Sequence, residues 1–205
     1  MEGGPTMDKI QYERELYTPL RQHLEAQGFE VRSEVLACDL VAKKNDLIYI
    51  IEMKRHLSFD LLAQAVERQS YADVVYVCIP KPNQFKQDKV WKSKIKVLKQ
   101  LELGLLLVSK NSKTYLVEEA LIPNNLKPKR ASVKKRAALE KEFDHRSMDL
   151  NIAGSSGVPL VTAYREAALF IAHLIYQHGP QPQKGLKALG AHPKKTAGIL
   201  NANYY

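Results

Sequence analysis

The chain has 205 residues, 45% of them hydrophobic and 26% charged, which is the mix of an ordinary globular protein. This length can bury one good core and leaves room for a second, smaller module. No run of about 18 apolar residues occurs, and the N-terminus lacks the basic and apolar regions of a signal peptide, so we expect no membrane partner.

The formal net charge of +9 favours a polyanionic partner, because lysine and arginine side chains release counterions from phosphates. Residues 81–99 hold seven lysines and one acid, and residues 127–146 hold eight basic residues and three acids. A net charge of +9 is equally typical of a basic protein that binds no polyanion. The clustering of the basic residues in two segments favours nucleic acid as the partner. Cys38 and Cys78 lie in apolar runs, which predicts reduced core thiols and a cytoplasmic location.

Helices and strands alternate in the first part of the chain. Apolar residues at helical spacing predict a helix from Ile10 to Gln27, and Pro19 predicts a kink or a break within it. The next predicted elements are strands at 29–35, 36–43 and 47–54, a helix from 59 to about 72, a strand at 74–79, a Lys-rich helix at 84–102, and strands at 104–108 and 114–117. A strand, a helix and a fully apolar strand in this order form a βαβ unit with parallel strands. The expected fold class is therefore α/β, with one mixed sheet flanked by helices and ending near Ile122.

The remaining chain predicts a linker and a small helical module. Residues 123–157 are polar and basic, are helix-prone from Ser132 to Phe143, and end in a Gly/Ser-rich hinge. Three helices follow, the first capped by Thr162 and the others opened by Pro182 and Pro193. The predicted organisation is a core domain at 1–122, a basic linker with a helix at 123–157, and a helical module at 158–205.

Three ionisable residues converge at the end of the predicted hairpin. If Asn45 and Asp46 form a two-residue loop, paired positions sum to 91, which places Asp39 opposite Glu52 on one face of the sheet. Lys54 projects to the same face, because it lies two residues beyond Glu52. Opposed carboxylates repel each other, and a divalent cation reverses that effect, since hard oxygen ligands suit Mg²⁺.

The alternative is a surface ion pair of Glu52 with Lys54 beside a solvated Asp39, because so short a pattern arises often by chance. The apolar run at 47–51 marks a buried central strand and favours the metal site.

The order of these residues resembles the PD-(D/E)XK phosphodiesterase superfamily, which has the restriction-endonuclease-like fold. The resemblance is greatest to a bacterial family of putative PD-(D/E)XK phosphodiesterases, and it covers nearly the whole chain. It is carried by residues 12–16, 34–42, 50–54, 61–68 and 158–165. It implies that Asp39 and Glu52 bind a divalent metal, Mg²⁺ or Mn²⁺, and that Lys54 assists hydrolysis. Cys38 stands where the superfamily's name has proline.

An acid in the first helix is expected to join this site. Glu13 shares a helical face with the apolar Tyr17, whereas Glu15 lies on another face. A carboxylate on an apolar face requires a partner, such as a metal or Lys54. Glu13 is therefore preferred over Glu15 as the third metal ligand.

The helix after the hairpin carries further polar candidates. Gln64, Arg68 and Tyr71 fall on one helical face and are predicted to support the site or to touch a phosphate. An ordinary polar helix face is the alternative.

The C-terminal helices resemble a helix-turn-helix with winged-helix leanings. The expected recognition helix is 193–201, and the lysines suited to phosphates are Lys184, Lys187, Lys194 and Lys195. A small unit for protein contacts is the alternative. The sequence stops at Tyr204 and Tyr205, where a wing hairpin would begin, so either the wing is missing or the module is not a full winged helix.

Together these features predict a magnesium-dependent nuclease that hydrolyses DNA. The first alternative is a nucleic-acid-binding module with a nuclease-like fold and little or no hydrolysis. A weaker one is an adaptor whose basic helices bind acidic protein surfaces. A homodimer is the expected assembly if both strands of a duplex are cut.

Overall fold

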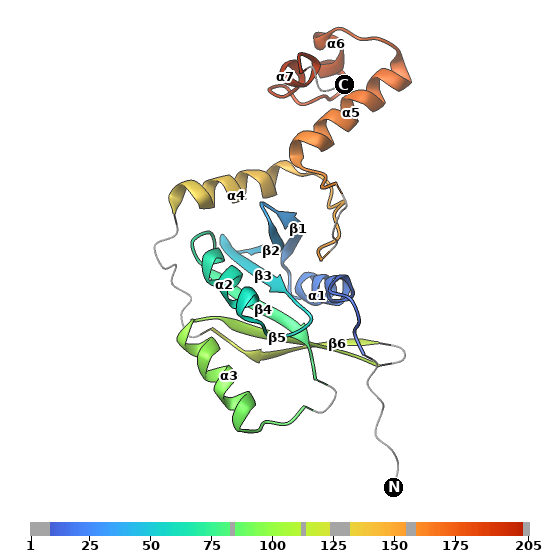
Figure 1. Ribbon diagram of the computed structural model, residues 1–205. Coiled ribbons are helices and arrows are strands. Elements are labelled where there is room, and N and C mark those ends of the chain that lie inside the picture. The colour runs from blue at the N-terminus through green and yellow to red at the C-terminus, as the bar shows by residue number, and fades with distance from the viewer. Residues whose placement is uncertain (1–8, 83–84, 112–113, 124–131, 155–158, 203–205) are drawn as a thin grey trace. The chain divides into compact units, whose positions relative to one another are not determined.

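The computed structural model describes residues 9–82, 85–111, 114–123, 132–154 and 159–202 (Figure 1). The chain divides into two compact units. The first comprises Met1–Phe143 and Asn151–Val158, and the second comprises Asp144–Leu150 and Pro159–Tyr205. Among the described residues, no helix is long and apolar enough to cross a membrane.

A six-stranded mixed sheet forms the first unit, and its strands lie in chain order. They are β1 (Glu30–Val35), β2 (Cys38–Lys44), β3 (Leu47–Met53), β4 (Val74–Pro80), β5 (Gly104–Lys110) and β6 (Tyr115–Leu121). The pairs β3–β4 and β4–β5 are parallel, and the other neighbours are antiparallel. Parallel neighbours require crossover connections, which the helices α2 (Phe59–Arg68) and α3 (Lys89–Gln100) provide. The predicted α/β class with a mixed sheet and flanking helices is confirmed, and it is consistent with a PD-(D/E)XK-like fold.

The β2–β3 hairpin has the predicted register. Leu40 pairs with Ile51 and Val41 with Ile50, so paired positions sum to 91. The turn residues Asn45 and Asp46 both have positive φ, 50° and 62°. Positive φ at both central positions defines the hairpin turn whose twist matches the strands, and short polar side chains tolerate that conformation.

Helices cover both faces of the sheet (Figure 1). Helix α1 (Arg14–Ala26) packs on one face, where its buried residues join the core: Leu16, Tyr17, Leu20 and Leu24. The opposite face buries side chains of α2, α3 and α4 (Val133–His145): Leu61, Ala65, Leu98, Leu139 and Phe143. The central strands are therefore apolar on both sides, as β4 illustrates with six consecutive buried residues.

Helix α1 begins later than the periodicity predicts. The Glu15 carboxylate accepts hydrogen bonds from the backbone N–H groups of Gln11 and Tyr12, both at 2.9 Å. These bonds keep the preceding residues out of the helix, which starts at Arg14. The helix continues through Pro19, so the predicted alternative of a break there is wrong.

Part of the predicted linker belongs to the first unit. Leu139 and Phe143 of α4 are buried in its core. The Ser33 hydroxyl donates to the carbonyl of Asn151 at 2.7 Å, and the Gly154 N–H donates to the Glu34 carboxylate at 3.1 Å. The compact units therefore do not coincide with boundaries at residues 122 and 157. Residues 124–131 and most of the predicted hinge, 155–158, lie outside the described residues.

The second unit contains α5 (Ala163–His178), α6 (Gln183–Ala188) and α7 (Thr196–Leu200). Their small core consists of Ala168, Ile171, Leu174, Leu186, Ala191 and Ile199. The predicted recognition helix is shorter than 193–201, because His192 Nδ1 accepts the backbone N–H groups of Lys194 and Lys195 ahead of α7. The predicted winged-helix character is not confirmed, and the start of the wing lies outside the described residues.

Candidate active site

Asp39 and Glu52 meet at the end of the hairpin opposite its turn. The register that pairs Leu40 with Ile51 sets Asp39 against Glu52. The backbone N–H of Met53 donates to Asp39 Oδ2 at 2.8 Å, which fixes the Asp39 side chain across the two strands. Glu52 is only 2% exposed. The hairpin therefore holds two carboxylates on one face of the sheet.

Burial makes ionisation of this pair unfavourable. Burial, and after it the charge of Asp39, raises the pKa of Glu52 to about 7. Burial also raises the pKa of Asp39, while the Met53 hydrogen bond and the Lys54 charge act in the opposite direction. A cation at the pair would offset this repulsion.

Arg68 forms a hydrogen-bonded ion pair with Glu52. Its Nε donates to Glu52 Oε1 at 2.7 Å, and a second guanidinium nitrogen donates to the Ala37 carbonyl at 2.7 Å. Tyr71 lies 5.9 Å from the guanidinium carbon, measured to the ring centre, while Gln64 is half-buried on the same helix. The expectation that this helix face supports the site fits Arg68. The sequence did not identify Glu52 as the partner of Arg68, although a buried carboxylate requires a nearby cation.

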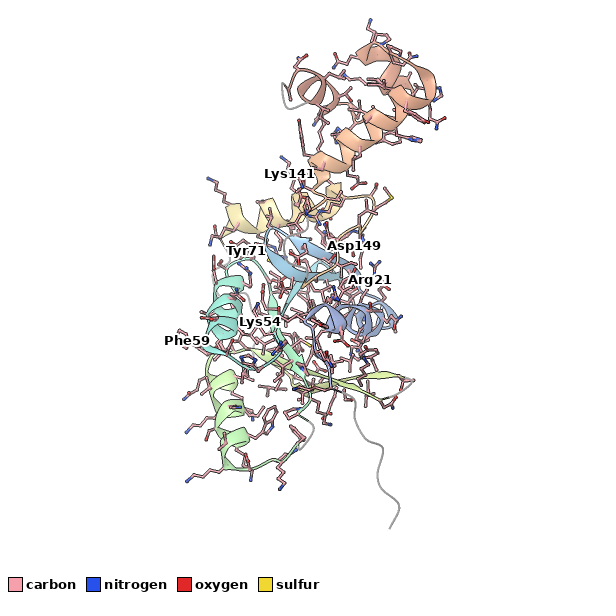
Figure 2. All side chains as sticks on the ribbon, turned by 45° about the vertical axis from the view of Figure 1, so that its right-hand side comes forward. Arg21, Lys54, Phe59, Tyr71, Lys141 and Asp149 are labelled. Atoms are coloured by element: carbon pink, nitrogen blue, oxygen red, sulfur yellow. The ribbon has the colours of Figure 1, made fainter. Side chains whose placement is uncertain are left out.

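Lys54 and Glu13 form the second part of the site. The Lys54 N–H donates to the Cys78 carbonyl at 3.0 Å, so the pairing of β3 with β4 extends to Lys54. Figure 2 labels the Lys54 side chain on the ribbon. Its Nζ lies 3.5 Å from Glu13 Oε2. Glu15 instead binds Lys110 at 3.1 Å. The structure thus places Glu13, rather than Glu15, beside Lys54.

The donor set fits a divalent cation through two carboxylates. Asp39 Oδ1 and Glu52 Oε2 make no hydrogen bond within the described residues. Mg²⁺ commonly keeps several waters and binds one or two protein carboxylates together with phosphate. In the described part of the chain, no three His, Cys, Asp or Glu side chains are grouped as a ligand set. Glu13, expected as a third ligand, forms an ion pair with Lys54, and its role as a metal ligand stays a prediction.

The C-terminal candidates belong to the second unit. Lys194 is exposed, whereas Lys195 Nζ donates to the Ala163 carbonyl at the start of α5, at 3.2 Å. Their predicted role in binding phosphate stays a prediction.

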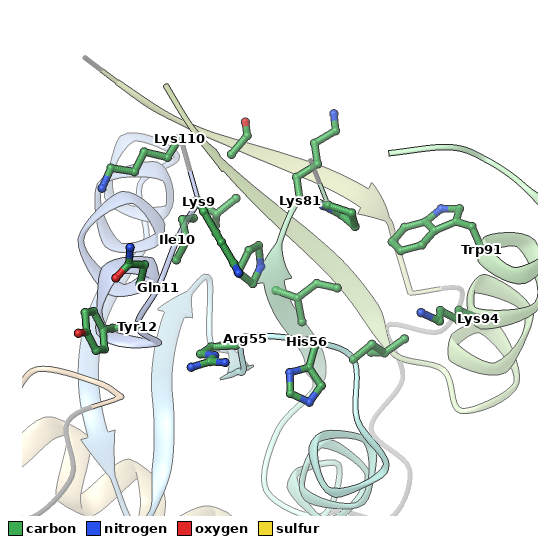
Figure 3. Close-up of a pocket in the computed structure, with 16 residues that line it drawn as sticks. Lys9, Ile10, Gln11, Tyr12, Arg55, His56, Lys81, Trp91, Lys94 and Lys110 are labelled. Carbon is green, nitrogen blue, oxygen red and sulfur yellow. The ribbon is translucent and has the colours of Figure 1, made fainter. Parts of the chain in front are cut away.

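Sequence reasoning missed a basic cavity that is lined by the residues directly after Lys54 and directly before Glu13 (Figure 3). Its lining side chains come from the segment before α1, the residues after Lys54, the end of β4, α3 and β5. No local sequence pattern shows that such distant segments meet. Only the basic residues in these segments could have indicated the cavity.

Comparison with protein families supports the resemblance. Residues 106–205 match a family described as "Putative PD-(D/E)XK phosphodiesterase (DUF2161)". Comparisons with curated proteins and with solved structures gave no match. The matched residues begin within β5, so they do not include Asp39, Glu52 or Lys54. Over residues 106–205 the chain is thus similar to the family described as putative PD-(D/E)XK phosphodiesterases.

Proposed function

We propose that the chain is a metal-dependent phosphodiesterase that hydrolyses nucleic acid, with DNA as its substrate. One observation carries the proposal: the buried carboxylate of Glu52 and the half-buried carboxylate of Asp39 converge on one face, each with an oxygen that has no hydrogen bond within the described residues. The position of Lys54 two residues beyond Glu52 supports it, as does the family description.

Asp39 and Glu52 would hold the cation, Mg²⁺ or Mn²⁺, which when bound lowers the pKa of a water and stabilises negative charge on the phosphate. The ammonium group of Lys54 lies at the same strand end, where it stabilises the charge that develops on the phosphate oxygens. Glu13 holds Lys54 Nζ and so acts as a positioning residue. Arg68 orients Glu52 through the 2.7 Å hydrogen bond, and its positive charge favours the ionised form of that carboxyl.

The test is cleavage of labelled single-stranded DNA, duplex DNA and RNA with Mg²⁺, with Mn²⁺ and with EDTA. We expect cleavage that requires metal, and a loss of at least about 100-fold in Glu52→Gln and Asp39→Asn, as for removal of charge stabilisation at an active site. The matched control is Glu30→Gln, since Glu30 is exposed, lies opposite Lys43 in the β1–β2 register near the other end of the hairpin, and forms an ion pair with Arg32. The proposal is refuted if no substrate is cleaved in a metal-dependent way, or if Glu52→Gln keeps full activity.

A binding module with little or no hydrolysis is the second candidate. The Arg68–Glu52 bond favours it, because the guanidinium already neutralises a carboxylate that a metal would need. This candidate predicts salt-sensitive nucleic-acid binding that is unchanged by Mg²⁺ and is not followed by cleavage.

A further inference from the structure

A cavity of about 650 Å³ adjoins the candidate active site. Arg55 and His56, which directly follow Lys54, line it, as do Gln11 and Tyr12, which directly precede Glu13. Figure 3 shows Tyr12 and Gln11 on one side, Trp91 on the other, and Arg55 and His56 between them. Whatever occupies the cavity therefore lies next to the groups assigned to catalysis.

The lining of the cavity is strongly basic. Five lysine or arginine residues face it and no aspartate or glutamate does: Lys9, Arg55, Lys81, Lys94 and Lys110. Lys81 binds Glu118 at 2.5 Å and Lys110 binds Glu15 at 3.1 Å. Within the described residues, no ion pair involves the other three. Like charges that share a cavity repel each other, so a ligand with several negative charges would stabilise this arrangement.

Aromatic side chains accompany the charges. Trp91, the single tryptophan of the chain, lines the cavity from α3, and Tyr12 lines it from the segment before α1. The Phe85 ring packs edge-on against Trp91, with ring centres 4.9 Å apart, and so supports it from the side. A basic groove with aromatic side chains is typical of surfaces that bind single strands, because bases stack on the rings while phosphates meet the cations.

The size of the cavity points to one strand rather than two. Cavities of about 300–1,000 Å³ hold small molecules, and 650 Å³ lies in this range. A few nucleotides of one strand fit such a space, whereas the paired width of a duplex does not.

We infer that this cavity binds a single strand of nucleic acid beside the hydrolytic site. Its phosphates lie against Lys9, Arg55 and Lys94, and one base stacks on Trp91. The inference deepens the proposed function, on which it rests for the choice of nucleic acid as ligand. It adds that the substrate reaches the carboxylates as an unpaired strand.

Tryptophan fluorescence tests this directly, because all of it comes from Trp91. The full chain is titrated in EDTA, which prevents metal-dependent cleavage, with a 12-nucleotide oligothymidylate or with a blunt 12-base-pair duplex. We expect the single strand to quench the emission and the duplex to leave it nearly unchanged.

Charge reversal supplies the matched control. Lys94→Glu should weaken the quenching titration on the order of tenfold, since it removes one phosphate contact and adds a repulsion. Lys96 lies two residues away on the same helix, is also exposed and does not line the cavity, so Lys96→Glu should bind like the wild type.

The inference is overturned if the duplex quenches Trp91 as well as the single strand does, or if both reversals weaken binding equally. Metal-dependent cleavage without quenching would overturn it and leave the proposed function standing. Quenching by the single strand that Lys94→Glu weakens, without metal-dependent cleavage, would support it and refute the hydrolytic function.

Discussion

Glu52 is a carboxylate in an apolar sheet, and its surroundings determine what the site can bind. A buried carboxylate stays ionised only beside a cation, and Arg68 supplies one at 2.7 Å. Asp39 adds a second negative charge, which favours a further cation. A metal at Asp39 and Glu52 would therefore share Glu52 with Arg68, each cation at a different oxygen.

The pair should make the metal-free protein sensitive to pH. The pKa of Glu52 in the folded chain, about 7, exceeds its ordinary value of 4.5. Between these values the folded chain holds a proton that the unfolded chain has lost, so the contribution to stability falls as pH rises toward 7 and above. Asp39→Asn removes the neighbouring charge and keeps an oxygen for the Met53 N–H. We expect it to raise the free energy of unfolding in EDTA by about 1 kcal/mol at pH 8 and by less at pH 5.5.

Urea unfolding at the two pH values measures this difference, with Glu30→Gln as the control. Added Mg²⁺ should stabilise the wild type at pH 8 and have little effect on Asp39→Asn. A variant less stable than the wild type at pH 8 would contradict the prediction, as would a difference that does not change with pH.

Helix α4 is attached to the first unit by a charge pair as well as by its apolar residues. Arg136 binds Asp73 at 2.8 Å, and Asp73 also accepts the backbone N–H of Ile48 at 2.8 Å. The Asp73 side chain is only 5% exposed. Arg136 thus supplies the cation for the buried carboxylate of Asp73, which directly precedes β4.

Arg136→Ala should destabilise the chain by about 3 kcal/mol, because it leaves a buried carboxylate without its cation. Urea unfolding gives the size of the loss, and hydrogen exchange of the α4 amides should accelerate with it. Lys134→Ala, an exposed neighbour on α4, should change neither quantity. Equal stability of the two variants would mean that the apolar contacts alone hold the helix.

At this scale, local patterns predicted more than distant contacts did. The hairpin register followed from two turn residues, because a two-residue loop leaves no freedom in pairing. The later start of α1 depended on the Glu15 side chain, which periodicity does not reveal. The Arg68–Glu52 pair and the basic cavity required tertiary contacts between segments far apart in the chain, so residue spacing could not identify them.

The charge of the whole molecule is spread over two units that would contact nucleic acid in different ways. The cavity of the first unit is suited to one strand, and the exposed lysines of the second are proposed to bind duplex phosphates. A homodimer stays the predicted assembly for cleavage of both strands of a duplex.

Replacement of Lys184, Lys187 and Lys194 by alanine should therefore weaken duplex binding and reduce its salt dependence. Each lost phosphate contact lowers the slope of log K against log salt by roughly 0.9, so the triple variant should lose up to about 3. Fluorescence anisotropy with labelled duplex measures the slope. Quenching of Trp91 by a single strand should stay unchanged and serves as the internal control. An unaltered duplex slope would leave the second unit with protein contacts as its function.

The chain passes back and forth between its two units, and this connectivity limits how recombination could exchange one unit for another. The chain leaves the first unit after Phe143, returns at Asn151, and leaves again after Val158. No single cut of the chain separates the two units. Ala153 belongs to the core of the first unit, although it follows residues 144–150 of the second. A recombination event that exchanged the second unit for another would need breakpoints on both sides of the returning segment. We therefore expect the two units to be inherited together rather than shuffled as separate modules.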